Sequence, residues 1–383
     1  MFSPHTFLRA LCALPHRGAA TPAGAEAARL LQTQLADLGA TVRMQAFETP
    51  KTYITIVYWL LGGVLVGLAL LTVTGVAVGF VWYFVAMAWF YFNGRYSFII
   101  KFPVQHTAHN VIGHWPARTT ADDVQTVILM AHYDTAPVSL LYKTGFRTRL
   151  ILLLVLMLLA AMAATLEAVG IGLPYLTYLR YGLMAYFVLQ ATLGTLGYWL
   201  RGYSNGASDN ATGVAAALAT ADRLRRANLP NLAIEVVLTS AKEAGMIGAY
   251  YYVDAQKKKW KRNRTTAIHF DTLGAGLLTI VEKAGTLEPL RYQNEPTRMA
   301  RKLLKTDAFR DRSQTGNGHT ADFDSVWFVR NDIPVLALCA MDARGRMSPV
   351  HQASDTLDGV EPAAMETAID LAVAVVQHMM KDK

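Results

Sequence analysis

Two long apolar stretches interrupt a chain whose remaining pattern alternates between helix-like and strand-like periods. Residues 52–94 contain no charged side chain, and this run is about twice the roughly 20 residues that a helix needs to cross a hydrocarbon core. Residues 150–200 form the second stretch, broken near its middle by Glu167 and Arg180. Buried core helices are the alternative, but uncharged runs of this length are rare in cores. Each stretch therefore predicts a hairpin of two transmembrane helices, the first turning near Thr74.

These hairpins also predict how the chain is oriented. Each one returns the chain to its starting side, so segments 1–51, 95–149 and 201–383 lie on one face of the bilayer. The opposite loops carry only Glu167 and Arg180. Basic residues flank the spans on the first face: Lys51, Arg95, Lys101, Lys143, Arg147, Arg149 and Arg201. The positive-inside rule then predicts an integral, multi-pass membrane protein with four helices and the bulk of the chain facing the cytoplasm.

The amino terminus and the cysteines fit this picture. The first fifty residues lack a basic segment followed by an apolar one, so we expect no cleaved secretory signal. Cys12 and Cys339 are the two cysteines, too few for a disulfide framework, which agrees with a reducing compartment.

A net charge of +8 and a basic run at Lys257–Arg264 raise the question of a polyanionic partner. No aromatic and basic recognition module accompanies the run, so we expect no nucleic acid. At the cytoplasmic face of a membrane, the run is suited to contact with anionic lipid headgroups, each basic residue contributing on the order of 1 kcal/mol. A plain solvated loop explains the same residues equally well.

Outside the hairpins, the pattern indicates one α/β domain made of residues 1–51, 95–149 and 201–383. Leucines on one face predict a helix at Ala25–Leu38 that stops at Gly39. Short apolar runs predict strands at Thr126–Met130, Ala233–Leu238, Ala267–Phe270 and Pro334–Leu338. We expect a three-layer α/β/α fold with a mostly parallel, mixed central sheet, interrupted by the two transmembrane helical hairpins.

Five candidate metal ligands follow in order along this domain: His132, Asp209, Glu243, Asp271 and His351. Three of them, His132, Glu243 and Asp271, lie at or just beyond the carboxyl ends of predicted strands, where open α/β sheets place their sites. Singly, each has a simpler explanation, such as a helix N-cap for Asp209 or a solvated surface histidine. Together their nitrogen and oxygen donors suit zinc, and manganese or cobalt also accept such a set.

The chain resembles the zinc-dependent M28 peptidases, a group that includes aminopeptidases, glutaminyl cyclases and some non-catalytic relatives. The resemblance covers most of the chain outside the hairpins, and it rests on the amino-terminal helix and on Asn110–Gly113, His132-Tyr133-Asp134, Gly206–Gly213, Glu243-Ala244-Gly245, Asp271 and His351–Thr356.

The resemblance implies two zinc ions. His132 and Asp271 would hold one ion, Glu243 and His351 the other, and Asp209 would bridge them. Asp134 would orient His132, as carboxylates beside metal-bound histidines do. The long interval between His132 and Asp209 is then explained by the second hairpin, inserted in a loop beside the site.

One residue departs from the family pattern. The family has two consecutive glutamates, of which the first is the general base, and Lys242 stands at that position here. A protonated lysine cannot accept the proton of the attacking water, and loss of a general base costs about 10²–10⁴-fold in rate.

Three functions stay open at this stage. The first, which we favour, is a membrane-bound metallopeptidase, an aminopeptidase that hydrolyses N-terminal peptide bonds of a peptide substrate. Its base is either Lys242, made neutral by a lowered pKa, or another group that substitutes for it. The second is a catalytically silenced binding or scaffold protein. The third is a hydrolase or acyl-transfer enzyme acting on another amide, whose anionic group Lys242 would neutralise.

Overall fold

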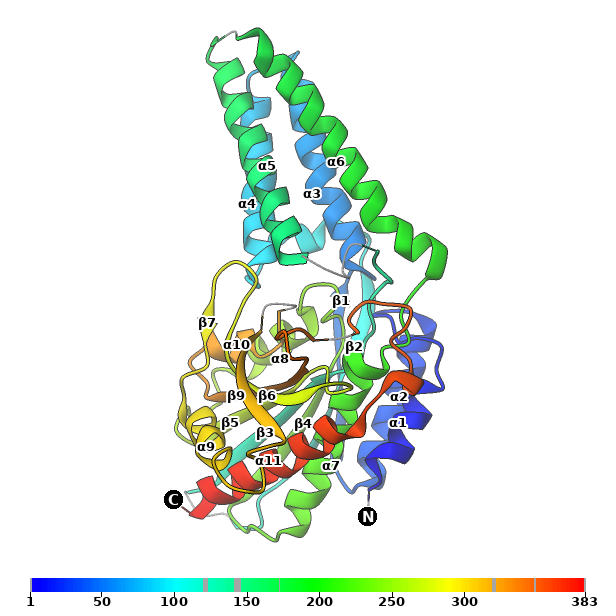
Figure 1. The fold of residues 1–383 in the computed structure, drawn as a ribbon, viewed down its shortest axis with the longest axis vertical. Helices are drawn as coiled ribbons and strands as arrows, with labels where there is room; N and C mark the ends of the chain where they lie inside the picture. The colour runs from blue at the N-terminus through cyan, green and yellow to red at the C-terminus, as the bar shows by residue number, and fades with distance from the viewer. Residues whose placement is uncertain are drawn as a thin grey trace.

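The computed structural model describes residues 2–119, 123–140, 146–171, 173–318, 322–347 and 349–381. An α/β body carries an array of four long helices at one end (Figure 1). Both chain termini lie at the opposite end of the body, away from the array. The apolar stretches and the alternating segments of the sequence therefore separate in space.

A nine-stranded sheet forms the centre of the body, in the order β1-β2-β4-β3-β5-β9-β6-β7, with β8 paired to β6. The strands are β1 (Thr41–Thr49), β2 (His106–Trp115), β3 (Gln125–His132), β4 (Leu232–Thr239), β5 (Thr265–Phe270), β6 (Leu277–Ala284), β7 (Leu290–Arg291), β8 (Ser313–Gly318) and β9 (Val335–Met341). The four predicted strands correspond to β3, β4, β5 and β9. These four are adjacent and parallel, and they form the middle of the sheet.

The sheet is mixed, but it is less parallel than the sequence suggested. In the described part of the chain, β1, β2 and β4 pair antiparallel on one side, and β6 pairs antiparallel with both β9 and β7 on the other. Edge strands of this kind are partly exposed and lack the continuous apolar run of a buried parallel strand. The apolar pattern of β1, β2 and β6 is correspondingly weak, so it did not predict these strands.

The alternation of side chains along the central strands builds a core on each face of the sheet. In β3, Val127 and Leu129 join the core shared with α7 and α11, whereas Ile128 and Met130 join the core shared with α8 and α10. Successive strand residues point to opposite faces, so strands covered on both sides are apolar throughout. The result is a sheet with helices on both faces.

One of the body helices was predicted from the sequence. The helix expected at Ala25–Leu38 is α2, which begins earlier, at Pro22, because the Thr21 side chain accepts from the Gly24 amide as an N-cap. The body helices are α1 (Pro4–Cys12), α2 (Pro22–Asp37), α7 (Thr212–Arg226), α8 (Ile247–Gln256), α9 (Glu295–Leu303), α10 (Val326–Val329) and α11 (Pro362–Lys381).

The two apolar stretches fold as two helix pairs, which together we call the helix array: α3 (Tyr53–Leu70) with α4 (Ala77–Phe92), and α5 (Phe146–Ala168) with α6 (Pro174–Arg201). By length and composition, α3, α5 and α6 can each cross a membrane. With 16 residues, α4 is shorter than the roughly 20 that a straight span needs. Their interior side chains, among them Leu60, Phe84 and Met157, are buried, while outward ones such as Val66 and Val188 are about half exposed.

One buried cation ties the amino-terminal segment to the middle of the body. Arg17 is fully buried and donates from Nε to the Tyr133 carbonyl at 2.8 Å. Its two Nη atoms donate to the carbonyls of Asn205 and Gly206, each at 2.7 Å. A planar guanidinium can satisfy several acceptors at once in this way. Arg17 thus fixes the segments that follow β3 and precede α7.

We expect Arg17→Met to lower the free energy of unfolding by about 3 kcal/mol or more, because buried carbonyls left without a donor cost ~1–3 kcal/mol each. The thermal unfolding midpoint of the purified protein measures this. Arg9→Met, an exposed substitution on α1, is the control and should leave the midpoint unchanged. Equal midpoints for the Arg17 variant and the parent would contradict the role given to Arg17.

Candidate metal centre

The five candidate ligands converge at one edge of the central sheet. His132 is the last residue of β3 and Asp271 follows β5 directly. Glu243 lies in the loop after β4, and Asp209 lies in the turn Ala207–Ala211 before α7. His351 comes from the loop after β9. Because β3, β4, β5 and β9 run parallel, their carboxyl ends bring these side chains together, and all five are buried.

Asp209 lies at the centre of the cluster. His132 Nε2 is 3.3 Å from Asp209 Oδ1 and 3.8 Å from Asp271 Oδ1. On the other side, His351 Nε2 is 3.7 Å from Asp209 Oδ2 and 2.6 Å from Glu243 Oε2. The two oxygens of Asp209 therefore face two separate histidine–carboxylate pairs, which is the arrangement that a bridging carboxylate requires.

The donor set fits a divalent cation. His132, Asp209 and Glu243 each offer one ligand atom, and these three atoms lie within 4.8 Å of one another. Asp271 Oδ2 is buried and has no hydrogen-bond partner in the described part of the chain. A buried carboxylate is costly unless a positive charge lies beside it. Three buried carboxylates in one cluster therefore favour a bound cation. Mixed imidazole and carboxylate donors are the set that zinc and similar ions take.

Asp134 has more than the one role expected of it. Its Oδ1 lies 3.6 Å from His132 Nδ1, while its backbone carbonyl lies closer, 3.1 Å from the same nitrogen. Its carboxylate accepts the amide N–H groups of Lys242 and Glu243, each at 3.1 Å. Asp134 therefore orders the loop that carries Glu243 in addition to facing His132.

Lys242 is buried inside the cluster. Its Nζ lies 2.8 Å from Glu243 Oε1 and 3.6 Å from Asp209 Oδ1. Burial lowers the pKa of Lys242, but the charges of Asp209, Glu243 and Asp271 outweigh burial and hold it well above the ordinary value. To act as a neutral base, Lys242 would need a pKa below the ordinary value. Bound divalent cations would lower the pKa of Lys242, because a nearby positive charge disfavours its charged form.

The pKa values of the carboxylates are set by the same neighbouring charges. Burial raises the pKa of Asp271, but the charge of Lys242 and the contact with His132 outweigh it and bring the value down to about 2. The pKa of Glu243 is also lowered, since His351 and Lys242 offset its burial. The cluster is therefore built to keep its carboxylates ionised, as ligands must be.

Two positioning residues had no role assigned from the sequence. Asp355 accepts the amide N–H groups of Ser208 and Asp209, at 2.7 and 3.1 Å. Asn210 Oδ1 accepts from the Gly213 and Thr272 amides, at 3.1 and 2.9 Å. Both fix the turn that presents Asp209. The sequence shows Asp355 four residues after His351, but its partners, Ser208 and Asp209, belong to a distant segment, so no local pattern predicted the contact.

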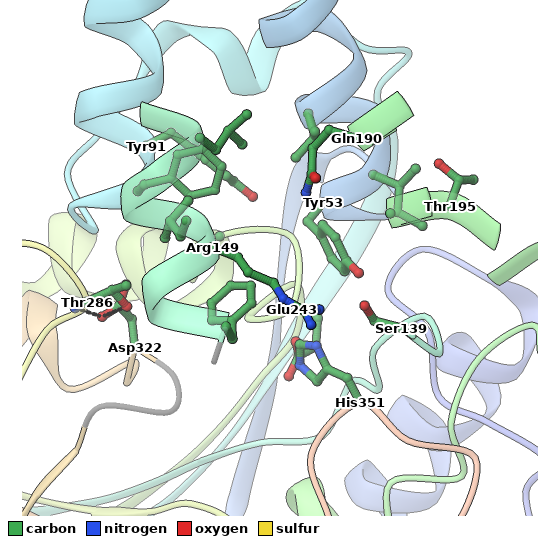
Figure 2. A pocket seen from close by; sticks show the side chains of 18 of the residues that line it. Tyr53, Tyr91, Ser139, Arg149, Gln190, Thr195, Glu243, Thr286, Asp322 and His351 are labelled. Atoms are coloured by element: carbon green, nitrogen blue, oxygen red, sulfur yellow. Dashed lines mark hydrogen bonds and ion pairs between the residues drawn. The ribbon is translucent and has the colours of Figure 1, made fainter. Parts of the chain in front are cut away.

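A cavity of about 190 Å³ lies where the cluster meets the helix array, and we call it the basal cavity. Lys242, Glu243 and His351 form its floor, and side chains of α3, α4, α5 and α6 form most of its walls. In Figure 2, Tyr53 and Gln190 point into this space from α3 and α6, and Arg149 extends from α5 toward Glu243 and His351.

The helix array also contacts the cluster directly. The ring of Tyr53, the first residue of α3, stacks on His351 with centroids 6.2 Å apart. The hydroxyl of Tyr91, near the end of α4, donates to the Ala244 carbonyl at 3.1 Å. The array therefore supports a candidate ligand and the loop that carries Glu243.

Comparisons with known proteins agree with this geometry. The model of peptidase family M28 matches residues 185–376, half of the chain. That range holds Asp209, Lys242, Glu243, Asp271 and His351, whereas His132 precedes it. None of the curated proteins compared by sequence matches the chain.

Solved structures show the same fold at low sequence identity. A zinc aminopeptidase from Bacillus subtilis superposes with a TM-score of 0.59 at 14% identity, covering 98% of this chain and 94% of that one. A glutaminyl cyclase from Porphyromonas gingivalis gives 0.57 at 13% identity, covering 98% and 97%. A Zn-dependent exopeptidase from Parabacteroides distasonis gives 0.55 at 14%, covering 100% and 97%.

We expect Asp355→Asn to weaken the binding of a divalent cation about 10–100-fold, the usual effect of losing a group that orients a ligand. The amide of asparagine would set an N–H against one of the two backbone donors that Asp355 now accepts. Calorimetric titration of metal-depleted protein with zinc measures the affinity. Asp358→Asn, an exposed change in the same segment, is the control. Unchanged affinity in the Asp355 variant would contradict the assigned role.

Proposed function

The chain belongs to peptidase family M28, and from that premise we propose that it is a membrane-bound, metal-dependent hydrolase of peptide-type amide bonds. The observation that carries this proposal is the convergence of His132, Asp209, Glu243, Asp271 and His351 at the strand ends, with Asp209 between two histidine–carboxylate pairs. An aminopeptidase and a hydrolase of acylated amino acids both fall within this function. They differ in the charge that flanks the scissile amide.

We assign the ligand roles as the geometry groups them. His132 and Asp271 would hold one zinc ion, Glu243 and His351 a second, with Asp209 between them. Zinc bound there supplies Lewis acidity, which polarises the scissile carbonyl and lowers the pKa of a water molecule. The substrate amide would lie in the basal cavity, above Glu243 and His351. The apolar walls of the cavity reduce the local polarity around that place, which strengthens the charges there.

Lys242 changes the distribution of proton-transfer roles. Its ammonium group is a donor, so it can hydrogen-bond to a developing oxyanion or give a proton to the departing amine. It cannot accept the proton of the attacking water. The proposal therefore predicts turnover slower than that of a site with a glutamate at this position, by about 10²–10⁴-fold.

A silenced site that only binds its ligand is the second candidate function. The observation that favours it is the contact of Lys242 with Glu243 and Asp209, two of the proposed metal ligands. In that case the protein would keep the fold, the cavity and at least one ion without turnover.

The helix array supports the membrane part of the proposal. α3, α5 and α6 have the length and composition of spans, and α4 lies beside them in the same array. Residues on the outer surface, including Trp59, Ile151 and Leu189, are apolar and more than a third exposed. Exposed apolar surface over four adjacent helices is typical of contact with lipid. The basic segment Lys257–Arg264 precedes the amino end of β5, whereas the array lies beyond the carboxyl ends of the central strands, so we propose a solvated loop there and no contact with anionic headgroups.

Removal of metal tests the proposed function. Purified protein treated with a chelator should lose hydrolysis of a panel of dipeptides, aminoacyl amides and acylated amino acids, and zinc should restore it. Metal content is measured on the same samples. His132→Ala should reduce both metal content and activity.

Lys242→Glu separates the two candidate functions within the same experiment. For an enzyme slowed by its lysine, activity present in the parent should rise about 10²–10⁴-fold. Lys242→Met, which removes the charge without adding a base, should not show this rise. Metal-loaded parent protein without hydrolysis of any substrate, together with activity only in Lys242→Glu, would refute the enzyme and support the silenced site.

Orientation in the membrane is tested by labelling single cysteines in a Cys12→Ser background, where Cys339 is buried. A membrane-impermeant maleimide should label Val73→Cys and Val169→Cys, in the turns of the array, on intact cells. Lys258→Cys, in the basic segment, should react only after lysis. The reversed labelling pattern would overturn this orientation.

A further inference from the structure

The basal cavity has two contrasting parts. Toward the helix array its walls are apolar and include Ile54, Val57, Leu150, Leu153 and Ala191. Toward the body it meets the charged floor of Lys242, Glu243 and His351. A ligand that fills both parts must itself be amphipathic, with an apolar chain on one side of its reacting group.

The apolar walls belong to the inserted helices. Val188 and Leu189 are exposed on the outside of α6, while the next two residues, Gln190 and Ala191, line the cavity. One helix thickness therefore separates the cavity from the surface that we assign to lipid. An apolar chain that partitions into a bilayer meets a similar environment inside the cavity.

The net charge of the cavity floor determines whether the ammonium group or the carboxylate of an amino acid can bind there. Three carboxylates of the cluster face two cationic side chains, Lys242 and Arg149, and the Arg149 side chain extends toward Glu243 and His351 (Figure 2). With the buried carboxylate of Asp134 counted as well, one divalent cation brings this group to zero net charge, and the second ion of the proposed pair makes it net positive. A free α-ammonium group would be repelled, whereas a carboxylate would be attracted.

We propose that the ligand of this site is an N-acylated amino acid, with its acyl chain in the basal cavity, its amide over Glu243 and His351, and its carboxylate toward Arg149 and Lys242. The proposal rests on the proposed hydrolase function for its chemistry. Water adds to the acyl carbon, the carbon–nitrogen bond breaks, and the nitrogen leaves with a proton from that water. The products are a fatty acid and a free amino acid, so no further reactant is needed.

Gln190 has a defined place in this arrangement. It is a polar residue within an apolar helix and points into the cavity from α6 (Figure 2). Polar side chains in membrane segments typically face a functional cavity. Gln190 marks the level where the apolar chain gives way to the polar amide.

The test uses the full-length protein in lipid nanodiscs, with N-acetyl-leucine, N-octanoyl-leucine and N-dodecanoyl-leucine as substrates and leucine release as the readout. We expect kcat/KM to rise at least tenfold from the acetyl to the dodecanoyl substrate. Leucyl-leucine, which has a free amine, should be the poorer substrate. Rates independent of chain length, or a preference for leucyl-leucine, would overturn the proposal.

Matched variants test where the acyl chain and the carboxylate of the ligand bind. Ala191→Trp fills the cavity and should reduce kcat/KM about tenfold more for the dodecanoyl substrate than for the acetyl substrate. Ala185→Trp, on the exposed side of the same helix, should change neither. Arg149→Gln should slow the hydrolysis of N-dodecanoyl-leucine several-fold more than that of its amide, N-dodecanoyl-leucinamide, which has no carboxylate. Equal effects of Ala191→Trp on both chain lengths would overturn the cavity assignment.

A binding experiment separates this inference from the hydrolase function. N-dodecanoyl-leucine with a photoreactive diazirine on its chain is crosslinked to the protein, and the labelled peptides are identified by mass spectrometry. Labelling within α3, α5 and α6 that Ala191→Trp abolishes supports the cavity ligand even if no substrate is hydrolysed, which would refute only the hydrolase. Hydrolysis without such labelling would refute the cavity ligand and leave the hydrolase standing.

Discussion

Three ionised carboxylates buried within a few ångströms of one another are the constraint on which the rest of the site depends. Asp209, Glu243 and Asp271 repel one another, and each loses its hydration on burial. The fold offsets this with His132, His351 and Lys242 and leaves room for metal. Backbone amides bound to Asp134 and Asp355 hold the two loops that carry Glu243 and Asp209 in place.

The same constraint links the membrane segment to the chemistry. Tyr53 stacks on His351, and Tyr91 holds the carbonyl of Ala244, so the array touches the loops that carry two candidate ligands. Helices that only anchored the chain would not need these contacts. The inserted hairpins supply a wall of the basal cavity as well as an apolar surface. The inserted helices would therefore help to select which substrates fit in the basal cavity.

Lys242 exchanges a negative charge for a positive one at the floor of the cavity. This substitution affects two properties together, because the lost carboxylate was a proton acceptor and the gained ammonium attracts anions. A slower reaction and an anionic substrate, as proposed, would thus both follow from one residue. The ion pair with Glu243 places the new charge beside the proposed reacting groups.

The sequence by itself determined the apolar stretches, the central strands and the identities of the candidate ligands. Buried parallel strands and long uncharged helices leave strong local patterns, and His132 and Asp271 could be read from strand ends. Tertiary structure alone decided the antiparallel edges, the roles of Arg17 and Asp355, the raised pKa of Lys242 and the basal cavity. Each of these depends on contacts between segments far apart in the chain, such as Asp355 with Ser208, and no local pattern records which distant groups meet.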